Sequence, residues 1–130
     1  MALTKRIKIG GAYYKGDVCI VSSASGDYSK VIVNTSGAAV NGMSITPDMY
    51  GALDSWKLVH YNDAAGTGTI LAVLAEGIHN VGAGATITLD FPAAEMLDNG
   101  QCLKFIYTNT ASIAGNVYLV SEFVGIKKTS

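Results

Sequence analysis

Short segments rich in Val, Ile, Thr, Tyr and Phe recur along the chain, separated by Gly, Asn, Asp and Ser. This pattern is typical of β-strands joined by turns, and no segment has the apolar spacing of an amphipathic helix of ten or more residues. The predicted strands are 3–9, 17–22, 28–34, 56–62, 69–75, 85–91, 101–108 and 116–126. About eight strands of this length predict an all-β fold, an antiparallel β-sandwich of jelly-roll type with one or two short helical turns.

Alternation assigns the faces of the last two predicted strands. In 101–108, Leu103, Phe105 and Tyr107 share one side. In 116–126, both sides are largely apolar, with Tyr118 and Val120 on the side opposite Val117 and Leu119. Such a strand is either central and covered on both faces, or it presents an apolar face to another subunit.

Two segments depart from the strand pattern. Residues 35–56 are too many for a tight hairpin, and Thr46 followed by Pro47 resembles a helix start, so we expect a short helical turn through about Tyr50. The segment 91–101 predicts a second short helical turn before the Asn99-Gly100 turn.

Glycine pairs precede several strands and first suggest ligand loops. Gly82 and Gly84 feed a strand, whereas phosphate loops normally feed a helix, and the sequence has no Lys or Arg between Lys57 and Lys104. We therefore interpret these glycines as turn residues at a sandwich edge. Three alternate residues after them, Ile87, Leu89 and Phe91, are expected to face one apolar layer, and Pro92 to end the strand's hydrogen bonding.

Length, charge and hydrophobicity limit the classes of protein to which the chain can belong. A chain of 130 residues and 13.5 kDa predicts one domain over 1–130, with 1–12 as an N-terminal arm. The net charge of −1 gives no bulk reason to expect direct nucleic-acid binding. The longest apolar run is 70–75, and the start lacks an apolar signal region, so we expect no membrane span and synthesis in the cytoplasm. Only 15% of residues are charged against 49% hydrophobic, which suits a surface of small polar residues or one buried against partners.

Residues with catalytic or metal-binding chemistry are scattered. Cys19 and Cys102 lie in apolar strands and are interpreted as buried free thiols, and the two histidines, His60 and His79, have no identifiable partner constellation. We therefore assign no catalytic residues, metal ligands or cofactor. Asp48 and Asp54 in the long loop leave an irregular calcium site open.

Aromatic and basic residues are the better candidates for recognition. Exposed rings stack on sugars or anchor protein interfaces, although they can also cap the ends of a sandwich. The candidate partner-interface residues are Lys5, Arg6, Tyr13, Tyr14, Met49, Tyr50 and Trp56.

The basic start "MALTKRIKIGG", the low charge and the Ala-Gly pairs before strands together resemble the small structural proteins of tailed-bacteriophage virions, most closely the head decoration (cement) proteins. The resemblance implies a virion protein made in the host cytoplasm. Such a protein binds the major capsid protein or another virion protein and stabilises the shell by bridging capsomers. The resemblance also implies a homo-oligomer, with a trimer favoured. The alternative is a carbohydrate-binding or adhesin-type module of a phage fibre or tail, and the sequence leaves head and tail location open.

Overall fold

The computed structural model describes residues 12–34, 39–51, 53–79 and 82–124, and only the backbone of residues 12, 13, 92–96 and 124. The described residues form eight strands and no helix. The strands are β1 (Ala12–Val21), β2 (Gly26–Val33), β3 (Ala39–Pro47), β4 (Ser55–Tyr61), β5 (Ile70–Ile78), β6 (Ile87–Met96), β7 (Cys102–Asn109) and β8 (Gly115–Val124).

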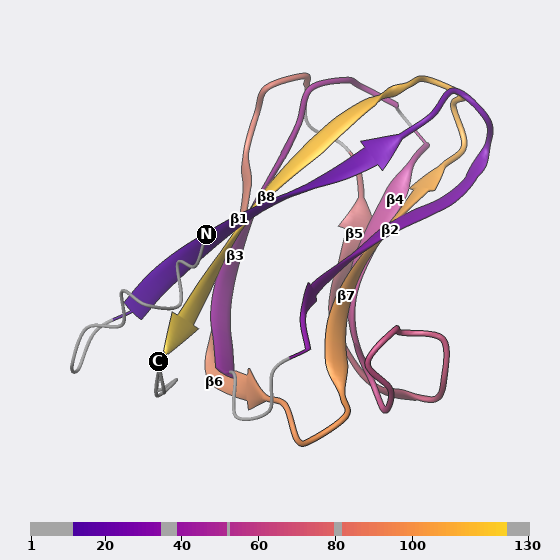
Figure 1. Cartoon of the computed structure of the whole chain (residues 1–130). Helices are drawn as coiled ribbons and strands as arrows, with labels where there is room; N and C mark the ends of the chain where they lie inside the picture. The colour runs from indigo at the N-terminus through magenta and orange to yellow at the C-terminus, as the bar shows by residue number, and fades with distance from the viewer. Residues whose placement is uncertain (1–11, 35–38, 52, 80–81, 125–130) are drawn as a thin grey trace.

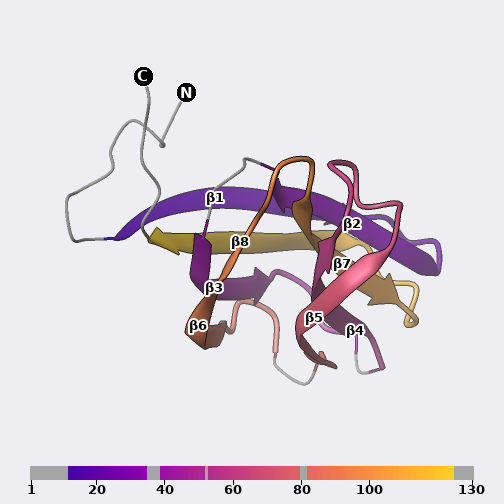
Figure 2. The same ribbon diagram turned by 90° about the horizontal axis from the view of Figure 1, so that it is seen from below.

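The strands form two four-stranded sheets that pack face to face (Figures 1 and 2). We name them sheet A, with strand order β1-β8-β3-β6, and sheet B, with order β2-β7-β4-β5. Every strand pair is antiparallel, and the chain crosses between the sheets at each connection except the β4–β5 hairpin, which is the connectivity of a jelly roll. The predicted fold class is therefore confirmed.

Seven of the predicted strands are confirmed, while the predicted strand 3–9 lies outside the described residues. The sequence pattern missed β3, which is central in sheet A between β8 and β6. Its inward residues Met43 and Ile45 are buried, but its outward residues are Gly42, Ser44 and Thr46. Because these outward residues are small and a bulge lies between Val40 and Gly42, the segment lacks the alternation of apolar and polar residues typical of a strand, and its sequence resembles a loop.

Both predicted helical turns are wrong. Thr46 and Pro47 are the last residues of β3, where pairing with β8 overrides the local helix-start signal. The segment after Phe91 does not turn into a helix, because β6 continues to Met96 through a bulge opposite β3. Pro92 therefore lies within the strand and does not end it, and the bulge accommodates its missing N–H.

The glycine pair before β6 forms a turn, as predicted. The Ala85 N–H donates to the carbonyl of Gly82 (3.1 Å), and Gly84 has a φ of +82°, which favours glycine. The Gly84 N–H also donates to the Pro47 carbonyl (2.7 Å), which ties the turn to the end of β3. β6 is an edge strand of sheet A, as the sequence predicts.

The core lies between the two sheets. Alternate residues of β7 and β8 fill its centre, and Leu103, Phe105, Leu119 and Phe123 are all buried. Ile87, Leu89 and Phe91 of β6 pack against this core from the edge, as predicted. Full burial of side chains of this size contributes about 1.5–3 kcal/mol each, which fixes the register of both sheets.

Candidate interaction surface

The outer face of sheet A is formed by all four of its strands. Cross-strand pairing arranges its side chains in rows that run from β6 through β3 and β8 to β1. The outward residues are Thr88 and Asp90 on β6, Gly42, Ser44 and Thr46 on β3, Asn116, Tyr118, Val120 and Glu122 on β8, and Tyr14, Gly16, Val18 and Ile20 on β1.

The β8 and β1 side of this face is apolar. Val18 is paired with Tyr118, and Gly16 with Val120, so apolar side chains of the two strands stand side by side. Tyr118 is 47% exposed, Val120 43% and Ile20 70%. No Lys or Arg of the described residues points outward here, because Lys15 of β1 turns inward to the carbonyl of Ile32 (2.8 Å). Of the two alternatives for the last strand, the structure therefore shows the exposed apolar face.

One row of the face is acidic and contains a small hollow. Asp90, Gly42, Glu122 and Tyr14 are opposite one another across all four strands. A Cβ atom on Gly42 would lie 3.2 Å from Glu122 Oε1 and 3.7 Å from Asp90 Oδ1, so the two carboxylates converge beside Gly42. The hollow measures about 70 Å³, and Ser44 and Thr88 also line it. This row offers hydrogen-bond acceptors beside an aromatic ring.

The structure leaves some of the predicted interface residues exposed and buries others. Tyr14 and Tyr50 are exposed on different parts of the molecule, whereas Met49 and Trp56 are buried, with 6% and 7% exposure. Those two residues are corrected to core residues: the inner face of β4 carries Trp56 together with Leu58 and His60, and Met49 packs against Gly115.

Lys5 and Arg6 lie outside the described residues, as does the side chain of Tyr13.

A buried polar network joins three residues that are far apart in the sequence. Asp54 Oδ1 accepts hydrogen bonds from the backbone N–H groups of Thr110 (2.6 Å) and Ala111 (2.9 Å). Its Oδ2 accepts the Tyr107 hydroxyl proton (2.7 Å), and that hydroxyl lies 2.6 Å from His79 Nδ1. Since Tyr107 donates its only proton to Asp54, Nδ1 of His79 must donate to the Tyr107 oxygen. Burial, reinforced by Asp54, raises the pKa of Tyr107 far above its usual value.

This network has a structural role. Asp54 and His79 are fully enclosed, and Asp54 ties the β7–β8 turn to the start of β4. Tyr50 covers His79 edge-on, with ring centroids 5.6 Å apart. Sequence spacing did not reveal the network because its members are separated by 25 residues or more.

The other chemical candidates are engaged locally. His60 Nε2 lies 2.7 Å from Gln101 Oε1, and Asp48 accepts the Asn116 N–H (2.7 Å). Neither Asp48 nor Asp54 belongs to a group of three or more potential metal ligands in the part of the chain that the structure describes. Cys19 and Cys102 are buried and free, as predicted, and burial raises the pKa of Cys19 to about 11.

The glycine turn before β5 is filled by the chain's own side chains. Asp63 accepts hydrogen bonds from the N–H groups of Thr67 (3.0 Å) and Gly68 (2.9 Å), which lowers its pKa. Asn62 Oδ1 accepts the Thr69 N–H (2.9 Å). The amides that would bind an anion are therefore already occupied.

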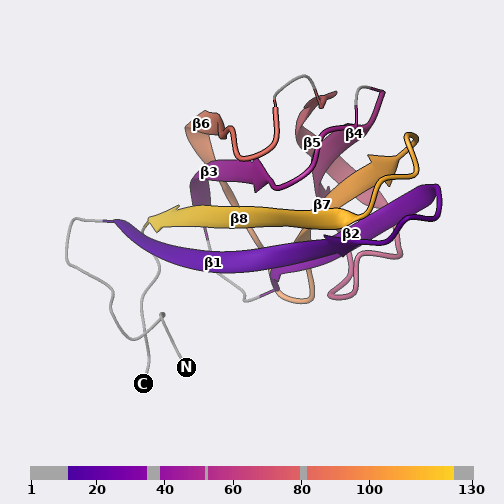
Figure 3. The same cartoon turned by 90° about the horizontal axis from the view of Figure 1, so that it is seen from above.

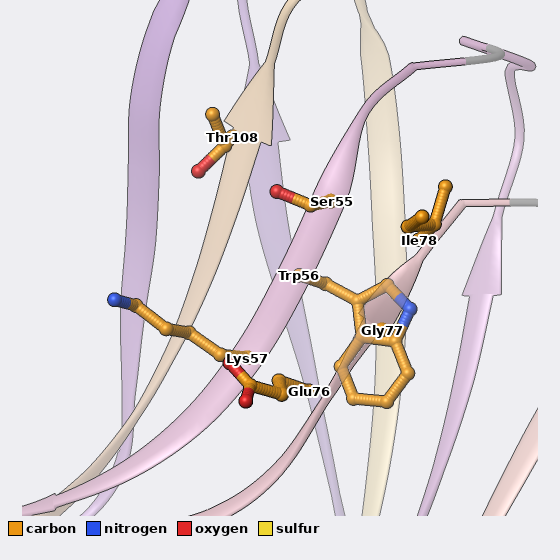
Figure 4. A pocket seen from close by; sticks show the side chains of 7 residues that line it. All are labelled: Ser55, Trp56, Lys57, Glu76, Gly77, Ile78 and Thr108. Atoms are coloured by element: carbon orange, nitrogen blue, oxygen red, sulfur yellow. The ribbon is translucent and has the colours of Figure 1, made fainter.

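A larger hollow of about 350 Å³ lies along β4 and β5 of sheet B. Figure 4 shows Lys57 and Glu76 side by side on these strands, while the Trp56 indole extends over Gly77 on the other side of β4. The hollow is lined by Ser55, Trp56, Lys57, Glu76, Gly77, Ile78 and Thr108. Because the indole is buried, this hollow lacks the exposed ring that sugar stacking requires.

No protein-family model and no curated protein matches the sequence. Structural neighbours include proteins of viral capsids. The structure is similar to PirA, with a TM-score of 0.47 and 10% identity over 83% of this chain and 92% of that one. It is similar to a chain of the cyanophage Pam1 capsid (TM-score 0.45, 17% identity, 87% and 85% covered). It is also similar to a chain of Broad Bean Stain Virus (TM-score 0.44, 8% identity, 90% and 92% covered). Scores and identities of this size carry no inference about function.

The described residues contain no helix that is long and apolar enough to cross a membrane.

Proposed function

We propose that the protein is a non-enzymatic virion structural protein, a capsid decoration protein that stabilises the shell by binding between capsomers. The observation that carries the proposal is the outer face of sheet A, on which apolar residues of β1 and β8 stay exposed. Contiguous apolar surface of this kind marks interaction sites in soluble proteins. The resemblance of the sequence to decoration proteins supplies the kind of partner.

The face has the composition of a protein interface. Tyr118 and Val120 form its apolar centre, and polar side chains of β3 and β6 form a rim with Glu122 and Asp90 at one end. Interfaces commonly combine an aromatic or aliphatic centre with a polar rim. The partner surface that fits is apolar in the middle, with a basic group opposite the two carboxylates.

The test uses capsids assembled without this protein. Wild-type protein should bind them saturably and raise their disassembly temperature. Val120→Lys places a charge at the apolar centre and should weaken binding by roughly tenfold or more, because buried unpaired charges are costly at interfaces. The matched control is Val73→Lys on β5, because Val73 is 45% exposed against 43% for Val120 but lies on sheet B. Equal binding by both variants would contradict the proposal.

A second function, carbohydrate recognition by a phage fibre or tail module, is favoured by the hollow between Tyr14, Glu122 and Asp90. Tyr14 offers a ring, and Glu122 and Asp90 offer acceptors for sugar hydroxyls. The test is a glycan array with the wild type, Tyr14→Ala and Gly42→Ala, since a methyl group on Gly42 would lie 3.2 Å from Glu122 Oε1 and displace that carboxylate. Saturable sugar binding lost in both variants would establish this function, and an array without binding would refute it.

A further inference from the structure

Among the described strands, β1 pairs only with β8, and its other edge differs from the other three edges of the sandwich. β1 pairs with β8 over ten residues without a register shift. The other edge strands, β2, β5 and β6, each have a bulge or irregularity against their neighbour, and β6 also contains Pro92. Bulges and prolines are the usual protections of sheet edges against pairing with another chain. Among the described strands, β1 is therefore the edge best shaped to accept one.

The charges of β1 are arranged symmetrically around a glycine. Lys15 and Asp17 flank Gly16 and form an ion pair within the chain, with Lys15 Nζ 2.7 Å from Asp17 Oδ2. Outside them, Tyr14 and Val18 point to the outer face of sheet A. Read in either direction from Gly16, the strand presents a charge and then an apolar residue.

We propose that β1 pairs antiparallel with β1 of a second copy, around a two-fold axis at Gly16. In this register Lys15 lies opposite Asp17 of the second copy and Asp17 opposite its Lys15. Tyr14 lies opposite Val18 of the second copy on the outer face. Opposite charges and aromatic–β-branched pairs directly across a ladder are stabilising, and glycines at the axis leave room for close approach.

Other registers of the same pairing are worse. A shift by one residue pairs outward with inward side chains, because the side-chain period of a strand is two. An axis at Lys15 or Asp17 places like charges opposite each other, which is destabilising. The axis at Gly16 is the one that sets each charge of β1 opposite its complement.

The chain's own residues 3–9, folding back at Gly10 and Gly11, are the competing occupant of this edge. A two-residue turn there would place Arg6 opposite Lys15, and like charges in that position disfavour the hairpin. The charge pattern therefore favours the second copy.

The dimer gives a specific form to the homo-oligomer of the proposed function, and it makes the outer faces of two copies of sheet A continuous. It specifies a two-fold dimer, where the resemblance to decoration proteins implied a trimer. A monomer or trimer that still binds capsids would overturn the dimer and leave the proposed function standing. A dimer that binds no capsid would refute the proposed function and leave the dimer standing.

The experiment is sedimentation equilibrium of the full chain with a charge exchange. Wild type should sediment at twice the chain mass of 13.5 kDa. Lys15→Asp and Asp17→Lys should each dimerise at least tenfold more weakly, since each sets like charges across the axis. An equimolar mixture of the two variants should form heterodimers, because every cross-strand pair in that mixture is again complementary. Wild type that stays monomeric or forms trimers, or a mixture that stays monomeric while wild type dimerises, would overturn the proposal.

Gly16→Cys, at the two-fold axis, tests the dimer independently if a charge variant fails to fold. A Cβ atom on Gly16 would meet only the Leu119 carbonyl, at 4.0 Å, so Gly16→Cys should fold. Under oxidising conditions it should form a disulfide-linked dimer, whereas the control Ser44→Cys on central β3 should not. The native thiols do not compete, because Cys19 and Cys102 are buried. If Thr4→Cys with Asp17→Cys forms an intramolecular disulfide and Gly16→Cys stays monomeric, residues 3–9 occupy the edge and the dimer is refuted.

Discussion

Removing the Asp54 carboxylate should destabilise the fold strongly. Asp54 is fully buried and accepts hydrogen bonds from the Tyr107 hydroxyl and from the backbone N–H groups of Thr110 and Ala111. Asp54→Ala leaves three donors without their acceptor. Each lost charge-assisted hydrogen bond costs roughly 1–2 kcal/mol, because water can enter at the exposed turn and partly replace the carboxylate. With three bonds lost, the free energy of unfolding should fall by about 3–5 kcal/mol. Because small domains are typically stable by about 5–15 kcal/mol, this loss is a large share of the total.

Urea unfolding followed by tryptophan fluorescence measures this change. Asp54→Asn keeps an acceptor for the two turn amides and loses the acceptor for Tyr107, so its loss should be about 1–2 kcal/mol. Asp63 is the matched control, because it also accepts bonds from a turn, at Thr67 and Gly68, but at the surface. Asp63→Ala should destabilise far less than Asp54→Ala. Equal losses for Asp54→Ala and Asp63→Ala would refute the claim that burial of the network sets its importance.

Two further predictions concern single residues. Burial raises the pKa of Cys19 from 9.0 to about 11 in the folded protein, so the unfolded chain loses its thiol proton first and stability falls as the pH rises from 9 to 11. Between pH 9 and 11 this thiol should lower the free energy of unfolding by about 2–3 kcal/mol. The free energy of unfolding of Cys19→Ala should therefore fall less steeply with pH over this window than that of the wild type. Equal slopes for the two proteins would contradict the assignment of this pH dependence to Cys19. Gly84→Ala should cost about 1–2 kcal/mol because its φ is +82°, although a Cβ there meets nothing within 4 Å. Gly82→Ala, equally open but without a positive φ, should be nearly neutral, and equal thermal shifts in the two variants would refute this explanation.

Alternation along the strands predicted the fold class because both sheets have one buried face. Leu103, Phe105 and Tyr107 share a side in the sequence and fill the core in the structure. The same rule failed for β3, where Gly42 and Ser44 alternate with buried residues but lack the branched and aromatic side chains typical of strands. Local signals at Thr46 and Pro47 could not reveal that β8 pairs with this segment.

Surface residues were harder to predict than the core. Alternation placed Trp56 on one face with Leu58 and His60, but it could not show that this face points inward. The network of Asp54 and Tyr107 joins residues 53 positions apart, so only the pairing of β4 with β7 in sheet B brings them together. Interaction surfaces depend on which face remains uncovered, and that is a property of the assembled sandwich.

The central claim is that the outer face of sheet A binds a partner in the virion. Figure 3 shows the two sheets from above, with β1 and β8 forming the side of sheet A that carries the apolar residues. Hydroxyl-radical footprinting of the protein, free and bound to the particle, measures the claim directly. Tyr118 on this face and Tyr50 away from it are 47% and 48% exposed, so they should be oxidised to a similar extent in the free protein. On the particle, oxidation of Tyr118 should fall several-fold while Tyr50 stays reactive. Unchanged oxidation of Tyr118 in particle-bound protein would contradict the account.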